Sequence, residues 1–137
     1  MKVFTINEET LRKCWGGADQ YWFSLSQYKI IDVSTLAEMD RPEQISQSAY
    51  FVSLGYIPYF VVTNREVIQA YVQTLTNEKL KTALSKIDED DYVESFWKYF
   101  NVYPQLSEGW DVFEQKYILE KAEKWCNENG IKYEIAL

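Results

Sequence analysis

The chain has 137 residues, of which 17% are aromatic, and it carries 21 acidic against 14 basic side chains, for a formal net charge of −7. This charge disfavours a nucleic-acid backbone or an anionic membrane surface as a partner, and it suits a basic protein or a cation. The length fits one domain, 1–137, which can bury about two thirds of its unfolded surface without a metal or a disulfide.

The N-terminal segment, MKVFTINEET, has too short an apolar run for a signal peptide. No window of the chain approaches the roughly 18 apolar residues of a membrane span. Cys14 and Cys126 lie far apart and form no C-x-x-C motif, so we interpret both as reduced thiols. We therefore expect a cytoplasmic protein without a membrane association.

The first part of the chain predicts a helix and then a β-hairpin. Asn7 is the expected N-cap of the helix, and Gly16-Gly17 ends it. The hairpin is expected at about 20–33, because this stretch is rich in aromatic and β-branched residues on both sides of Ser24–Gln27. The turn has no Asn-Gly or Asp-Gly pair, so its type stays open.

The middle of the chain carries weaker signals. Ser34–Gln47 is polar and predicts a loop, in which Pro42 marks either a turn or the start of a short helix. An aromatic run follows, and Tyr50–Leu54 is a candidate short strand. Pro58 restricts how far any pairing of this run continues, because proline has no backbone N–H to donate.

The second half predicts helices. Thr63–Glu66 matches a capping box, and apolar residues continue at helical spacing, so a helix is expected from about Asn64 to Leu75. Thr76 or Asn77 can cap the next helix, which runs into the acidic stretch that begins at Asp88.

Two further helices and a strand complete the predicted chain. One helix starts near Asp91 and ends before Pro104, and the other runs from about Ser107 to Asn129 with Gly130 as its stop. The tail at 131–135 alternates apolar and polar residues, so a short strand that can join the hairpin is expected there.

Aromatic residues recur at helical intervals along these last two helices, which are therefore expected to meet and to supply most of the core. The residues are Tyr92, Phe96, Trp97, Tyr99, Phe100, Tyr103, Trp110, Phe113, Tyr117 and Trp125. The whole pattern predicts a single α+β domain, in which a small antiparallel sheet is packed with about four to five α-helices.

The order of these features resembles a small bacterial family of unknown function, numbered 158 in the uncharacterised-protein-family series. Tyr21–Ser24 stands where the family's hairpin begins, Tyr103–Leu106 matches its Y-P-E-L segment between helices, and Trp125–Ile131 matches its W-L-E-E-N-G-I ending. The resemblance covers most of the chain and is one of pattern.

The chain departs from that pattern at several places. Ser24 replaces the family's hairpin aspartate, Tyr28 replaces its glycine, and Glu94 and Ser95 stand where its arginine pair would lie. The family has no established activity, so the resemblance assigns no residue a role.

The sequence lacks most of the motifs that mark catalytic sites. The sequence contains no histidine, which removes the commonest general base and metal ligand and excludes Ser-His and Cys-His nucleophile systems. It contains no glycine-rich phosphate loop and no G-x-S-x-G motif. No cofactor is expected, and the chain gives no positive sign of an enzyme.

The acidic run is the candidate metal site. Its aspartates, Asp88, Asp90 and Asp91, offer the carboxylate oxygens that Ca²⁺ and Mg²⁺ prefer, although their spacing differs from an EF-hand loop. The alternative interpretation is a solvated start to the next helix, where acidic residues compensate the helix dipole. A carboxylate pair such as Asp88 with Asp111 is a third interpretation.

The aromatic run around Gly55 is the candidate partner-binding site. Its members, Tyr50, Tyr56, Tyr59 and Phe60, lie where periodicity does not dictate burial, and tyrosine is favoured at the centre of protein interfaces. The alternative is that they are half-buried core rings.

Two functions therefore stay open. The first is a non-catalytic protein-interaction or regulatory module, with a protein partner or self-association. The alternative is a metal-assisted hydrolase or a divalent-cation-binding protein that uses the acidic loop.

Overall fold

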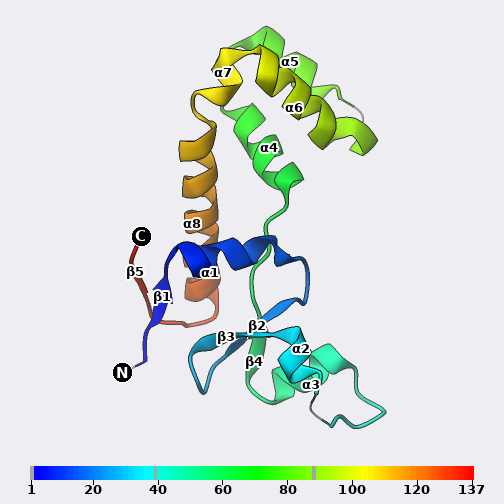
Figure 1. Ribbon diagram of the computed structural model, residues 1–137, viewed down its shortest axis with the longest axis vertical. Helices are drawn as coiled ribbons and strands as arrows, with labels where there is room; N and C mark the ends of the chain where they lie inside the picture. The colour runs from blue at the N-terminus through cyan, green and yellow to red at the C-terminus, as the bar shows by residue number, and fades with distance from the viewer. Residues whose placement is uncertain (1, 39, 88) are drawn as a thin grey trace. The chain divides into compact units, whose positions relative to one another are not determined.

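The computed structural model describes residues 2–38, 40–87 and 89–137, and it combines α-helices with short β-strands as the sequence predicts (Figure 1). The chain divides into two compact units. The first unit is Met1–Val61 with Lys121–Leu137, and the second unit is Val62–Glu120. Helix α8 (Trp110–Glu128) contributes residues to both units. The single domain expected from the sequence stays a prediction.

The first unit contains two small sheets. An antiparallel sheet has the strand order β3-β2-β4, and a parallel pair joins β1 and β5. The strands are β1 (Phe4–Ile6), β2 (Tyr21–Ser24), β3 (Lys29–Asp32), β4 (Tyr56–Pro58) and β5 (Tyr133–Ile135). The hairpin expected at 20–33 is therefore confirmed as β2 and β3. Pro58 is tolerated because β4 is an outer strand of its sheet.

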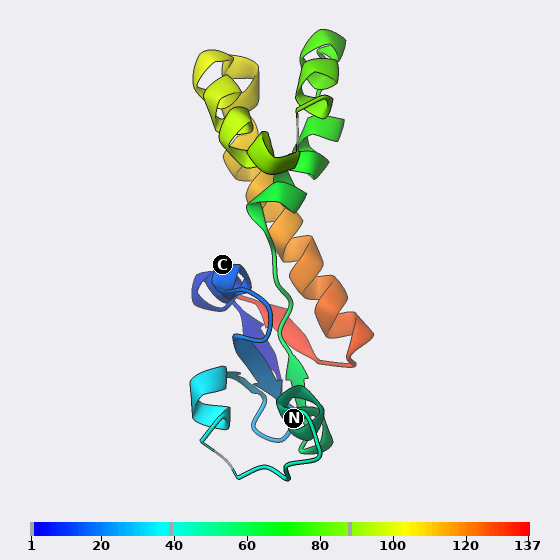
Figure 2. The ribbon, with the colours of Figure 1, turned by 90° about the vertical axis from the view of Figure 1, so that its right-hand side faces the viewer.

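The expectation that the C-terminal strand joins the hairpin is wrong. Strand β5 pairs with β1 instead, and the two lie side by side in both views (Figure 1, Figure 2). Gly130, with a φ of +66°, ends α8, and the Ile131 amide donates to the Cys126 carbonyl at 2.8 Å. The chain then turns back, and the Phe4 amide donates to the Lys132 carbonyl at 2.8 Å.

The helices of the first unit are short: α1 (Glu8–Arg12), the 3₁₀ turn η1 (Lys13–Gly16), α2 (Val33–Leu36) and α3 (Gln47–Ser53). Asn7 caps α1 as predicted, and its side chain accepts from the Thr10 amide at 2.9 Å. The short strand expected at Tyr50–Leu54 is wrong, because 50–53 lie in α3 and Leu54 is the C-cap of that helix. The Ser46 hydroxyl accepts from the Ala49 amide at 3.2 Å and so starts a helix.

The antiparallel sheet buries an aromatic side chain on each face, because successive residues of β2 point to opposite sides. Trp22 packs against Phe51, with ring centroids 5.2 Å apart, and against Leu36. Phe23 packs on the other face against Phe4 and Trp125, at 5.3 Å and 5.5 Å. Residues from both ends of the chain thus complete the core of the first unit.

The second unit is helical. Its elements are α4 (Asn64–Gln73), α5 (Glu78–Ser85), the 3₁₀ turn η2 (Glu89–Asp91), α6 (Tyr92–Val102), α7 (Pro104–Ser107) and the first part of α8. The capping box at Thr63 is confirmed, since the Thr63 and Glu66 side chains each accept from the other residue's amide. Asn77 caps α5, as one of the two expected alternatives.

The described residues form more α-helices than the four to five expected, because α2 and α7 are single turns that no apolar periodicity marks. Pro104 starts α7 at its first helical position, where the missing N–H costs nothing.

The aromatic stretch between Tyr92 and Trp125 builds two cores rather than one. In the second unit, Tyr71 and Phe96 pack against Trp110 with ring centroids 5.2 Å and 5.5 Å away. The Tyr71 hydroxyl also donates to the Leu106 carbonyl at 2.8 Å. Trp125 belongs to the first unit instead, because α8 crosses the division between the units.

Candidate functional site

The clearest apolar exposure beside the predicted aromatic site lies at the end of α3 and the start of β4. We call Tyr50, Val52, Leu54 and Tyr56 the α3–β4 surface. Val52 and Leu54 are 54% and 46% exposed. Tyr50 and Tyr56 are half-buried, and both pack against the buried cluster of Trp22, Leu36 and Phe51. This segment thus combines two exposed aliphatic side chains with two tyrosines that the core already holds.

The local sequence explains this exposure. Helix α3 directs Phe51 into the core, so the neighbouring Val52 points elsewhere. Gly55 has a φ of +90°, a conformation that side chains disfavour, and it turns the chain directly from the helix into β4. The Leu25 amide donates to the Gly55 carbonyl at 3.0 Å, so the exposed Leu25 of the hairpin turn lies next to this surface.

The other two predicted partner-binding residues, Tyr59 and Phe60, belong to the core. They are only 5% and 8% exposed, and both rings pack against Trp125. The Tyr59 hydroxyl donates to the Thr10 carbonyl at 2.8 Å, and burial raises the pKa of that hydroxyl. The structure therefore brings Tyr50 and Tyr56 to a surface but not Tyr59 and Phe60.

A hollow of about 540 Å³ lies beside strand β3 and includes Tyr56. We call it the β3 hollow. Its lining includes Lys29, Ile31, Asp32, Thr35, Leu36 and Tyr56. Ile30 and Gln27 also line it, so the hollow follows the length of β3, and Lys29 and Asp32 place opposite charges at the two ends of the strand.

The carboxylate of Asp32 is held in its ionised form. It accepts from the Ser34 amide at 2.8 Å, as the N-cap of α2, and from the Gln20 side-chain amide at 2.9 Å. These hydrogen bonds, that of the Ser34 amide above all, lower the pKa of Asp32. Asp32 is therefore a fixed negative charge at neutral pH.

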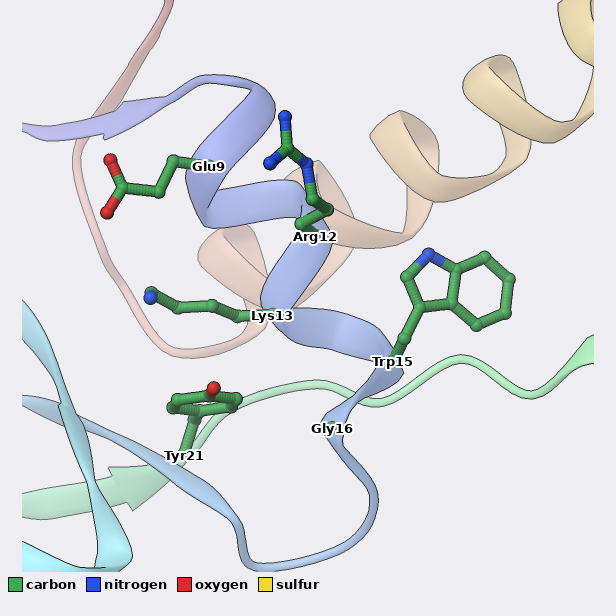
Figure 3. Close-up of a pocket in the computed structure, with 6 residues that line it drawn as sticks. All are labelled: Glu9, Arg12, Lys13, Trp15, Gly16 and Tyr21. Atoms are coloured by element: carbon green, nitrogen blue, oxygen red, sulfur yellow. The ribbon is translucent and has the colours of Figure 1, made fainter.

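A second hollow, of about 400 Å³, lies between α1–η1 and Tyr21 (Figure 3). Glu9, Arg12, Lys13 and Gly16 recur at helical spacing and line it from one side. Figure 3 shows Lys13 extending between Glu9 and Tyr21, and its ammonium lies 5.1 Å from the centre of the Tyr21 ring.

This second hollow contains charges of both signs. Arg12 also lies 3.8 Å from Glu8, in an exposed pair that contributes little. No single class of ligand is favoured by such a mixture. Sequence reasoning did not single the hollow out, although the helical spacing of its charged residues was a signal that could have been followed.

The predicted metal ligands are only partly described. Asp88 lies outside the described residues, and Asp90 and Asp91 are exposed and both lie in the 3₁₀ turn that precedes α6. Asp91 is the N-cap residue of α6, and its side chain makes no capping hydrogen bond there. Within the described ranges, no three His, Cys, Asp or Glu side chains gather as a metal site.

The two thiols are buried. Burial raises the pKa of the Cys126 thiol to about 11. Because the thiolate is the reactive form, this shift suits a packing role rather than nucleophilic chemistry.

Comparisons with protein-family models, with curated proteins and with solved structures find no significant match to the chain. The resemblance to a bacterial family thus stays an expectation. Among the described helices, none combines the length and the apolar character needed to cross a membrane.

Proposed function

We propose that the protein is a cytoplasmic, non-catalytic protein-interaction or regulatory module, which binds a protein partner through the α3–β4 surface. The observation that carries the proposal is the exposure of Val52 and Leu54 in the same segment as the half-buried Tyr50 and Tyr56.

The chemistry of this surface suits the centre of a protein interface. Tyrosine is enriched there because it offers a large contact area with few rotatable bonds. Tyr50 and Tyr56 are already held by the cluster around Trp22, so binding costs them little further conformational entropy. Val52 and Leu54 would lose apolar surface to the partner, which favours association.

The charge of the chain restricts the partner. A net charge of −7 repels a nucleic-acid backbone and attracts a basic protein. We therefore propose a protein partner with basic residues around an apolar contact.

Site-specific photo-cross-linking tests the proposal. A photoreactive phenylalanine analogue replaces Val52 in one sample and Val112 in a control. Both samples are incubated with lysate of the native organism and then irradiated. Val112 is a matched control because it is 73% exposed and lies in the second unit. The proposal requires a discrete cross-linked protein at position 52 that is missing at position 112.

Paired substitutions then distinguish binding at the α3–β4 surface from non-specific association with any exposed apolar side chain. Val52→Ser with Leu54→Ser should abolish the cross-linked complex in a pull-down, whereas Val102→Ser with Val112→Ser should leave it intact. Val102 is 69% exposed, so the control removes a similar amount of exposed apolar surface. Equal retention of the complex by the two double variants would contradict the proposal. Sedimentation of the purified protein shows separately whether the partner is a second copy of the chain.

A further inference from the structure

We propose that β3 binds an extended segment of the partner protein as an added antiparallel strand, and that the β3 hollow takes one apolar side chain of that segment. This inference rests on the proposed function and names its mode of recognition, because Tyr56 belongs to both the α3–β4 surface and the β3 hollow.

Strand β3 is an outer strand of its sheet, since the order is β3-β2-β4. The Val33 amide donates to the Gln20 carbonyl at 2.8 Å, and Ile31 is opposite Trp22 in the same register. In an antiparallel pair, alternate residues direct their backbone groups to the partner strand. Ile31 therefore faces β2 with its backbone, while the N–H and C=O groups of Ile30 and the N–H of Asp32 turn outward. The Asp32 carbonyl serves α2 instead, because Asp32 is the N-cap of that helix. They form a template for a further strand.

The β3 hollow lies where a side chain of an added strand would enter. Ile31 and Lys29 share the face of the sheet that carries Trp22, because side chains alternate along a strand. Leu36 and Tyr56 belong to the same face, where both pack around Trp22. An added residue opposite Ile31 would therefore place its side chain next to Ile31, on the face of the sheet that carries Leu36 and Tyr56. Backbone bonds combined with such side-chain pockets are the usual basis of strand addition.

The charges at the ends of β3 specify the segment. Asp32 is ionised and Lys29 is exposed at the opposite end of the strand. An antiparallel segment complementary to β3 would place a basic residue opposite Asp32, apolar residues opposite Ile31 and Ile30, and an acidic residue opposite Lys29. Its sequence pattern is basic, apolar, apolar, acidic.

The strand β3 of a second copy does not satisfy this requirement, although its sequence, Lys-Ile-Ile-Asp, has the same pattern. Lys29 is opposite Ser24 and uses its backbone groups toward β2, as Ile31 does. For Lys29 of a second copy to pair with Asp32 of the first, the backbone N–H and C=O groups of Lys29 would have to point away from its own β2. The occupant is therefore a segment of the partner protein, with its backbone groups free on one edge.

A synthetic peptide tests the inference. The probe is an acetylated and amidated hexapeptide, Thr-Lys-Val-Val-Glu-Thr, titrated into the ¹⁵N-labelled full chain and followed by NMR. Binding should shift the amide signals of Ile30 and Asp32 and slow their exchange with solvent, with little change at Ile31. The charge-reversed peptide, Thr-Glu-Val-Val-Lys-Thr, should bind roughly tenfold more weakly, because like charges then face one another.

N-methylated peptides separate strand addition from simple apolar contact, and they leave the protein unchanged. Methylation of the second valine, opposite Ile30, removes an amide that bonds to β3, and it should weaken binding roughly tenfold or more. Methylation of the first valine, opposite Ile31, alters an amide that points away and should change affinity little. Equal effects of the two methyl groups, or the absence of any binding, would overturn the inference.

A substitution in the protein provides a second test. Ile30→Pro removes an outward N–H while leaving the bonds between β2 and β3 in place, a position at which edge strands tolerate proline. The variant should keep its NMR fold and lose the peptide.

Failure of this inference and failure of the proposed function give different results. If the partner is cross-linked at position 52 equally well when the chain carries Ile30→Pro, strand addition is overturned and the α3–β4 surface stays the binding site. Peptide binding at β3 without any cross-link at position 52 would overturn the proposed surface instead.

Discussion

The hydroxyl of Tyr59 donates a hydrogen bond of 2.8 Å to the carbonyl of Thr10, which lies 49 residues earlier in the chain. This bond ties α1 to the segment that follows β4. Tyr59→Phe should lower the free energy of unfolding by about 1 kcal/mol, because it removes one buried hydrogen bond and little apolar contact. Urea unfolding measures the change. An unchanged midpoint, or loss of partner binding at full stability, would show that the hydroxyl acts elsewhere.

Gly16 is required by close contact with Tyr21. A Cβ atom at position 16 would lie 2.7 Å from Cε2 of Tyr21. Gly16→Ala should therefore destabilise the chain by about 1–3 kcal/mol, as overpacking usually does. Thermal unfolding measures this effect. Tyr21→Leu in the same chain should restore part of the lost stability, since the neighbouring side chain is then smaller. Additive losses in the double variant would rule out the contact.

The capping box before α4 makes a measurable local contribution. The Thr63 hydroxyl accepts from the Glu66 amide at 3.2 Å, and the Glu66 carboxylate accepts from the Thr63 amide at 2.8 Å. Thr63→Ala should cost about 1 kcal/mol in chemical denaturation. Thr63→Ser keeps the hydroxyl and should cost less. If serine and alanine are equally destabilising, the methyl group rather than the cap is responsible.

The Cys126 thiol should make stability depend on alkaline pH. Burial raises its pKa in the folded chain to about 11, above the ordinary value of 9.0. The folded state therefore holds its proton more tightly than the unfolded state, and this contribution is complete below pH 9 and is lost as the pH rises toward 11. The difference in unfolding free energy between the native chain and Cys126→Ala should shrink over that window. A constant difference would contradict the shift.

The acidic-loop hypothesis makes a separate prediction. If Asp88, Asp90 and Asp91 bind Ca²⁺, Mg²⁺ or Mn²⁺, millimolar concentrations of the ion should raise the melting temperature, because a ligand of the folded state stabilises it. Asp90→Asn with Asp91→Asn should remove the increase. A melting temperature that none of the three ions changes would refute the hypothesis.

Local signals predicted the elements that the structure confirms. The capping residues Asn7, Thr63 and Asn77 act within one helical turn, and the β2–β3 hairpin joins neighbouring segments. Each of these features depends on residues a few positions apart, so the sequence alone determines it.

The features that sequence reasoning missed depend on distant residues. The sequence of Tyr50–Leu54 is compatible with either a strand or a helix. The face of this segment that is buried is determined by the packing of Phe51 against Trp22, which lies far away in the sequence. Tyr59 is buried because Trp125 contributes to the same core from far along the chain. The partner of β5 is the three-residue β1, which is too short to show a periodic pattern.

The pairing of β1 with β5 affects the order in which the chain can fold during synthesis. Phe4 is opposite Tyr133, so β1 must wait for a strand that is synthesised much later. The second unit is continuous in sequence, and all of it has been synthesised before β5 leaves the ribosome. Closing the first unit also costs the entropy of a long loop. Until Trp125 and β5 have been synthesised, the first unit therefore leaves Phe4 and Phe23 without the ring that covers them, which favours aggregation of the incomplete unit.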